Sequence, residues 1–180
     1  MLLTYEECIK KYISDYNLKK QLDQNNIFKI ENGVYSTQLD VSDLDLISFK
    51  YPNAIFTMDS AFYYYGLTCV MLDFYCLAIK RTDTKIHNLS KNQFFLQENI
   101  FMLGKEKINY QGHEINIYNS ERLLIELIRN KNKLPFDFYK EIVGNYRNRI
   151  ESISFSEIEN YLKSFKYSEK IYNTIQLEIL

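Results

Sequence analysis

The dipeptide Asn32-Gly33 is the feature of this sequence that most restricts its local fold, because it stands between two short apolar runs. Asn-Gly in such a setting is the strongest short signal for a β-hairpin, since both residues tolerate a positive φ. Residues 27–30 and 34–35 are therefore expected to be antiparallel strands joined by a tight turn.

Two short helices are predicted before this hairpin. Thr4 and Glu7 have the spacing of a capping box, in which each side chain bonds the backbone N–H of the other residue. A second helix is expected to begin at Ser14 or Asp15 and to end near Gln24. Its exposed face would present Asn17, Lys19, Lys20 and Gln21.

Helix, tight turn, helix and hairpin follow one another in this order in a winged helix-turn-helix, although many other domains contain the same order. In such a head the second helix would enter a major groove, with Lys29 and Asn32 of the hairpin beside it. The head is expected to be truncated and to span residues 1–37.

Residues 38–180 are predicted to form an α+β domain with a β-rich middle and a helical C-terminal tail. Strands are expected at 54–57, within 69–79, and at 100–103, 105–110 and 114–118. Helices are expected to begin at Asp59 or Ser60, Ser120, Pro135, Ser156 and Ser168. The predicted fold class is α+β.

Charge is segregated along the 180 residues although the net charge is only −1. Residues 1–36 are neutral, residues 37–79 carry a net charge of −4, and residues 80–150 carry +5. This balance does not suit a protein that coats DNA non-specifically, but phosphate contacts need only a local patch. The candidate members of a basic patch are Lys80, Arg81, Arg122, Arg147 and Arg149; the alternative is an ordinary solvated surface of mixed charge. For Arg122 a further alternative is a partly buried position at the start of a helix, where it would bond carbonyls or an acid.

The sequence contains no recognisable catalytic motif. The two histidines have no partner at metal-ligand spacing, and Cys8, Cys69 and Cys76 are expected to be small buried hydrophobic residues with free thiols. We therefore expect no enzyme activity, no metal and no cofactor. A metal-dependent nuclease is the remaining enzymatic alternative, and the paired carboxylates that it would need are missing.

The sequence also lacks an apolar run long enough to span a bilayer, and its N-terminus does not have the pattern of a secretion signal. A cytoplasmic location and no membrane partner are expected.

Four stretches together resemble the AbiEi-type antitoxins of bacterial type IV toxin–antitoxin systems. They are residues 3–35, which end in Gly33-Val34-Tyr35, residues 51–68, residues 117–124 around Glu121-Arg122, and the helical segment after Pro135. The resemblance covers most of the chain. It differs at the N-terminus, where the family's head has an extra helix and only Met1-Leu2-Leu3 precede Thr4 here.

The resemblance implies an antitoxin that has no catalytic residues and needs no cofactor. Its N-terminal winged helix would bind operator DNA upstream of its own gene and repress transcription. Its C-terminal domain would counteract a nucleotidyltransferase-like toxin encoded nearby. The alternative within the same family is a protein-interaction module that has lost DNA binding together with the missing helix.

Overall fold

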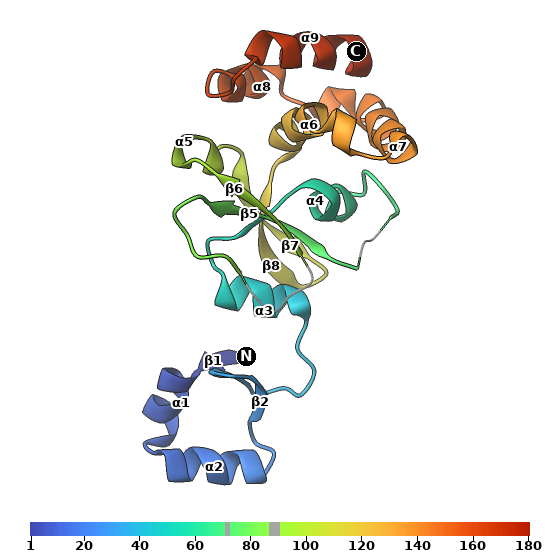
Figure 1. Ribbon diagram of the computed structural model, residues 1–180. Helices are drawn as coiled ribbons and strands as arrows, with labels where there is room; N and C mark the ends of the chain where they lie inside the picture. The colour runs from blue at the N-terminus through green and yellow to red at the C-terminus, as the bar shows by residue number, and fades with distance from the viewer. Residues whose placement is uncertain (71–72, 87–90) are drawn as a thin grey trace. The chain divides into compact units, whose positions relative to one another are not determined.

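The computed structural model describes residues 1–70, 73–86 and 91–180 (Figure 1). They divide into two compact units, Met1–Pro52 and Asn53–Leu180. Each unit contains helices and strands, which confirms the predicted α+β class. The first unit includes a helix, α3 (Asp43–Lys50), that follows the predicted head of residues 1–37.

Two helices begin the first unit, and the residues that cap them set their limits. In α1 (Tyr5–Tyr12), Thr4 accepts a hydrogen bond from the Glu7 N–H, and the Glu7 carboxylate accepts one from the Thr4 N–H. In α2 (Asp15–Asp23), the Ser14 hydroxyl accepts from the Asn17 N–H. Both predicted helices are confirmed.

A three-stranded antiparallel sheet completes this part of the unit. Its strands are β1 (Leu2–Thr4), β2 (Phe28–Glu31) and β3 (Val34–Ser36), in the order β1-β3-β2. The predicted hairpin is confirmed as β2 and β3, with Gly33 at a φ of 78° in the turn. Strand β1 was not predicted, because a three-residue strand is too short to have a recognisable period.

Helices α1 and α2, strands β1 and β3, and the residue before β2 contribute to one small hydrophobic core. Its buried members are Leu3, Cys8, Leu18, Ile27 and Tyr35, and Ile9, Tyr12 and Leu22 pack against them. Leu3 comes from β1, so the missed strand supplies both the sheet edge and a core side chain.

The second unit is built on a mixed five-stranded sheet with the order β6-β5-β4-β8-β7. The strands are β4 (Ile55–Phe56), β5 (Tyr75–Lys80), β6 (Lys91–Leu96), β7 (Lys105–Tyr110) and β8 (His113–Tyr118). The β7–β8 hairpin agrees with the prediction, and β4–β8 and β5–β6 are parallel pairs.

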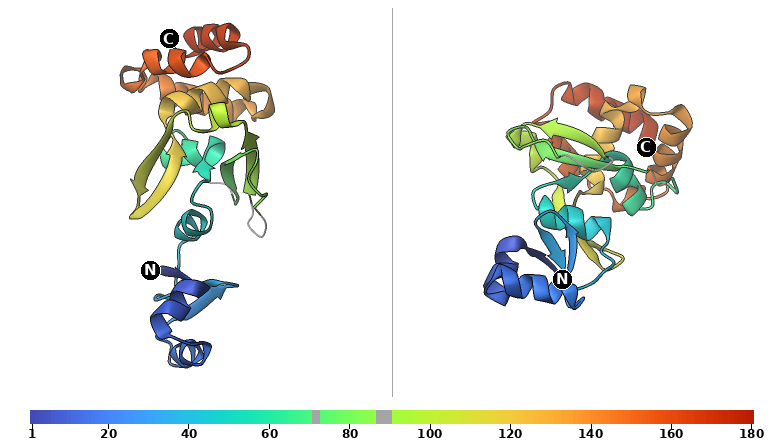
Figure 2. Two further views of the ribbon diagram at one scale, coloured as in Figure 1. Left: turned by 90° about the vertical axis from the view of Figure 1, so that its left-hand side faces the viewer. Right: turned by 60° about the horizontal axis from the view of Figure 1, so that its bottom comes forward.

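Helices α6 to α9 occupy one end of this unit, with α8 and α9 stacked over α6 and α7 and the sheet on the other side, whereas α4 and α5 lie beside the sheet (Figures 1 and 2). The helices are α4 (Met58–Tyr64), α5 (Glu98–Phe101), α6 (Ser120–Arg129), α7 (Phe136–Arg147), α8 (Phe155–Leu162) and α9 (Ser168–Ile179), with 3-10 turns η1 (Lys131–Lys133) and η2 (Ile150–Ser152). Helix α6 contacts α4, α8 and α9, and its residues from Glu121 to Ile128 are all buried.

Several predicted boundaries in this unit are wrong. The strand expected at 100–103 overlaps α5, because a short apolar run fits a helix or a strand equally well. The helix expected at Ser120 does begin there, but Asn119 caps it, and the helix expected to begin at Ser156 begins at Phe155 with Ser154 as its cap. Of the stretch 69–79, only residues from Tyr75 onward form a strand, and residues 71–72 lie outside the described residues.

The three thiols also differ in exposure, which corrects the expectation that all are buried. Cys8 and Cys76 are fully buried, whereas Cys69 is exposed. Burial raises the pKa of the Cys76 thiol to about 12, with the nearby Asp59 carboxylate adding to the effect, so this group stays protonated at neutral pH.

We expect Cys69 to be the one thiol that reacts rapidly with Ellman's reagent in the folded protein. One equivalent should be released quickly under native conditions and three after denaturation, because Cys8 and Cys76 become accessible only on unfolding. The Cys69→Ser variant should lose the fast phase. A fast phase that persists in this variant would contradict the assignment.

Gly104, which lies before β7, has a φ of 70° and no room for a side chain. An added Cβ would lie 2.5 Å from Cβ of Arg122 and 2.6 Å from Oδ1 of Asn119. Gly104→Ala should therefore lower the free energy of unfolding by roughly 2–4 kcal/mol, from backbone strain and overpacking together.

Gly112 provides the matched control, because it has a φ of 92° and open space around its Cα. Gly112→Ala should cost only the backbone term, roughly 1–2 kcal/mol. Urea denaturation of both variants measures the difference, and equal losses would show that the close approach to Arg122 does not matter.

Candidate nucleic-acid interface

Helix α2 presents two lysines to solvent. Leu18 is buried and fixes the rotation of the helix, so Lys19 and Lys20 are exposed. Tyr16 is 79% exposed and shares their face, because residues three and four apart are neighbours on a helix. Among the described residues neither ammonium group has a partner, so both are available to a phosphate.

The other two predicted contact residues on α2 use their side chains within the unit. The Asn17 amide donates to the backbone oxygen of Tyr12 at 3.0 Å, which ties α2 to the end of α1. The Gln21 Oε1 accepts from the Asn26 amide at 2.9 Å, which holds the turn after the helix. Both bonds favour a structural role for Asn17 and Gln21.

The hairpin brings two further predicted residues to the surface. Lys29 is exposed on β2 between half-buried neighbours, and Asn32 is exposed in the turn. The next acidic side chain, Glu31, is held by an ion pair with Lys50 of α3 at 2.5 Å, so its charge is compensated within the unit. Lys29 and Asn32 therefore remain accessible beside a neutralised carboxylate.

The turn between α1 and α2 contains a strained residue that sequence reasoning did not single out. Ile13 ends α1 with a φ of 72°, and its side chain is 83% exposed. A β-branched residue seldom adopts this conformation, so the tight connection between the two helices carries backbone strain. No pattern in the sequence marks such a position, because glycine is the residue expected there.

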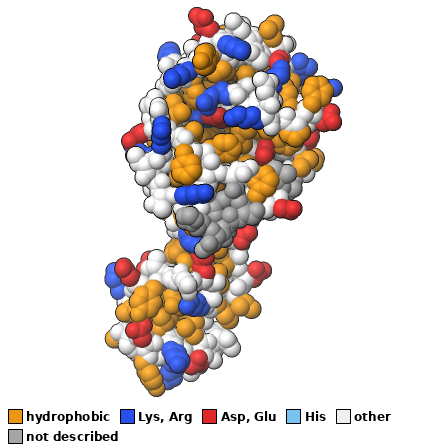
Figure 3. Space-filling model, viewed as in Figure 1, with side chains coloured by type: hydrophobic (Ala, Val, Ile, Leu, Met, Phe, Trp, Pro, Cys, Tyr) orange, Lys and Arg blue, Asp and Glu red, His pale blue; other side chains and the backbone are white. Residues whose placement is uncertain are grey.

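Positive charge in the first unit is local rather than continuous. On the face seen in Figure 3, lysine and acidic side chains are interspersed over this unit. The unit, Met1–Pro52, has six lysines and eight acidic residues and therefore a net charge of −2. Attraction to a polyanion therefore depends on local groups of exposed lysines, such as Lys19 and Lys20, and not on a broad field.

The prediction of a basic patch in the second unit is wrong for one of its five residues, and three others use their side chains in contacts within the unit. Arg122 is fully buried and is not on the surface at all. The Lys80 ammonium pairs with Glu98 at 2.6 Å, the Arg147 Nε donates to the Glu178 backbone oxygen, and Arg149 donates to the carbonyls of Tyr65 and Gly66. Arg81 is exposed.

The burial of Arg122 is tolerated because both terminal nitrogens of its guanidinium group have hydrogen-bond acceptors. One terminal nitrogen donates to Oε1 of Glu126 at 2.6 Å, and the other donates to the backbone oxygen of Ile100. The guanidinium lies between the rings of Tyr118 and Phe165, with centroids at 4.8 and 4.5 Å. Burial lowers its pKa, and the Glu126 charge opposes that shift.

The described part of the chain contains no group of three or more metal-ligating side chains. The carboxyl group of Asp59 lies beside the thiol of Cys76, with Oδ2 and Sγ 3.8 Å apart. Because burial raises the pKa of both groups, this pair lacks the thiolate that a cysteine nucleophile requires.

The ionised carboxylate of Asp59 is expected to lower the free energy of unfolding at neutral pH. Its Oδ1 atom is buried without a hydrogen-bond partner among the described residues, and burial raises the pKa of the carboxyl group. A carboxyl whose pKa is higher in the folded state binds more protons when folded, so its cost appears as the pH rises through the folded pKa.

The Asp59→Asn variant should therefore unfold with a free energy about 1 kcal/mol higher than the parent at pH 7. The gain should shrink as the pH falls toward the ordinary pKa of an aspartate, because the parent carboxyl is then protonated in both states. Urea denaturation at pH 7 and near pH 4 measures it. A gain that is the same at both pH values would show that ionisation of Asp59 is not the cause.

No protein-family model matches this chain, and no curated protein matches it either. The resemblance to the AbiEi-type antitoxins therefore stays a prediction that rests on the four stretches of sequence. Over the described ranges, no helix is both long and apolar enough to cross a bilayer.

Proposed function

We propose that this chain is the antitoxin of a type IV toxin–antitoxin system and binds DNA upstream of its own gene. The observation that carries the proposal is the arrangement of the first unit. A strand, two capped helices and a hairpin follow in order, and the second helix carries two free lysines. In a winged helix-turn-helix this second helix enters the major groove.

Strand β1 also supports the proposal. It pairs with β3 and closes the sheet on the side away from β2, while Leu3 enters the core between the two helices and the sheet. Residues Leu2–Thr4 are thus integrated into the unit. The winged-helix proposal does not need the extra family helix for a closed core.

The second part of the proposal is that Asn53–Leu180 counteracts a nucleotidyltransferase-like toxin encoded nearby. Large apolar side chains are exposed on its helices, which is a common property of protein-binding surfaces. They are Phe136 at the start of α7 and Leu177 and Leu180 at the end of α9. This observation also favours the alternative function, a protein-interaction module of the same family that does not bind DNA.

A promoter reporter distinguishes the two functions. The DNA upstream of the gene is fused to a reporter, and the full chain is supplied in trans. The proposed antitoxin should repress the reporter and should also restore growth when the neighbouring gene product is expressed. Growth rescue without repression would support the interaction module, and failure of both would contradict the family.

A further inference from the structure

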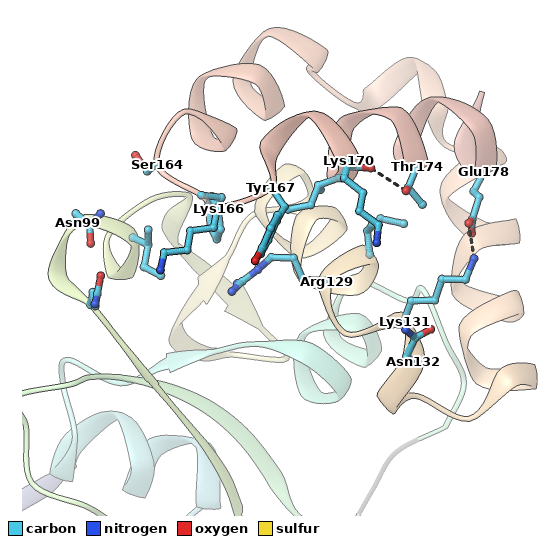
Figure 4. Close-up of a pocket in the computed structure, with 15 residues that line it drawn as sticks. Asn99, Arg129, Lys131, Asn132, Ser164, Lys166, Tyr167, Lys170, Thr174 and Glu178 are labelled. Carbon is cyan, nitrogen blue, oxygen red and sulfur yellow. Dashed lines mark hydrogen bonds and ion pairs between the residues drawn. The ribbon is translucent and has the colours of Figure 1, made fainter.

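A cavity of about 930 Å³ lies among the helices of the second unit (Figure 4). Its wall comes from four short segments: the start of α5, the end of α6 with η1, the loop between α8 and α9, and one face of α9. This volume falls in the range of small-molecule sites rather than of grooves that follow a nucleic-acid strand.

The wall of this cavity is strongly basic. It contains Arg129, Lys131, Lys166 and Lys170, and Glu178 is its one carboxylate. Lys131 is neutralised by an ion pair with Glu178. In the described part of the chain the ammonium groups of Lys166 and Lys170 have no partner, so the cavity keeps uncompensated positive charge.

Arg129 is the positioned cation of the cavity. One of its terminal nitrogens donates to both oxygens of Glu126 at 2.9 Å, and the guanidinium lies 4.8 Å from the centre of the Phe165 ring. Its side chain is 34% exposed and lines the cavity. A planar guanidinium fixed in this way is suited to bidentate contact with a phosphate.

Tyr167 adds an aromatic surface at the same place. It precedes α9 in a left-handed conformation with a φ of 61°, and its side chain is 80% exposed. In Figure 4 its side chain extends toward Arg129 and lies between Lys166 and Lys170. Stacking on an exposed tyrosine ring is a usual way to hold a nucleobase.

We infer that this cavity binds a nucleoside polyphosphate, with the phosphates at Lys166, Lys170 and Arg129 and the base against Tyr167. The inference goes beyond DNA binding and does not depend on it, because the two sites lie in different units. A ligand bound there would contact α6, α9 and the loop between α8 and α9 together.

Calorimetric titration of the full chain tests the inference with three probes: ATP, inorganic triphosphate and adenosine. ATP should bind, triphosphate should bind more weakly, and adenosine should not bind measurably. Lys166→Glu combined with Lys170→Glu should weaken ATP binding by about 100-fold, since each lost charged hydrogen bond is worth about tenfold or more. Tyr167→Asn, which suits a left-handed backbone, should weaken ATP binding and leave triphosphate binding unchanged.

The matched control is Lys19→Glu with Lys20→Glu in the first unit, which makes the same change of charge and should leave ATP binding unchanged. Circular dichroism should show that all variants fold, because the altered side chains are exposed. Absence of ATP binding by the parent chain would overturn the inference. Binding that is lost only in the control would overturn it too, as would equal affinities for triphosphate and ATP.

Discussion

Replacing Arg122 with methionine is expected to lower the free energy of unfolding by roughly 3–5 kcal/mol. Methionine keeps much of the volume between the rings of Tyr118 and Phe165 but removes the charge that pairs with Glu126. It also leaves the backbone oxygen of Ile100 without its donor. The loss is costly because Glu126 stays buried with only Arg129 left to compensate its charge.

Urea denaturation followed by circular dichroism measures this loss. Arg147→Met is the control, because Arg147 is exposed and donates one bond from Nε to a backbone oxygen; its loss should be below about 1 kcal/mol. Adding Glu126→Leu to Arg122→Met should recover part of the stability, since it removes a carboxylate that has lost a partner. Equal effects of the two arginine variants would contradict the structural role of Arg122.

Local chemistry explains which parts of the fold could be predicted. The capping box at Thr4 and the Asn32-Gly33 turn act through neighbours in the sequence, so their patterns are readable without the fold. Strand β1 could not be predicted, because it exists only through pairing with β3, more than thirty residues away in the sequence. The exposure of Cys69 likewise depends on where β5 begins and not on the apolar composition around it.

The residues of the candidate sites could likewise be predicted only where their positions depend on neighbours in the sequence. Lys19 and Lys20 could be placed on an exposed face, because Leu18 is part of a readable helical pattern. Burial of Arg122 near the start of a helix was one of two interpretations open from the sequence, but its contacts with Ile100 and Phe165 could not be predicted, because these residues are distant in sequence. The cavity was missed for the same reason, since its four segments come together only in the folded unit.

Charge reversal on α2 is the second change with a large expected effect. Lys19→Glu combined with Lys20→Glu should weaken binding to the DNA upstream of the gene by about 100-fold, at roughly 1.4 kcal/mol for each lost contact with a phosphate. The slope of log affinity against log salt should also fall by about 2, because two fewer counterions are released.

The matched control is Lys10→Glu combined with Lys11→Glu on α1. These lysines are exposed and lie in the same unit, and the change of net charge is identical. If α2 makes the contacts, the α1 variant should keep most of the affinity and nearly the whole salt slope. Equal losses in both variants would mean that only the general charge of the unit matters.

Recognition of DNA by the first unit is tested most directly by a fluorescence-anisotropy titration of the full chain. The duplex upstream of the gene is compared with a scrambled duplex of the same length and composition, at low and at physiological salt. If the first unit recognises its operator, binding to the upstream duplex should be tighter and should persist at physiological salt. Weak binding that is equal for the two duplexes and disappears with salt would contradict it.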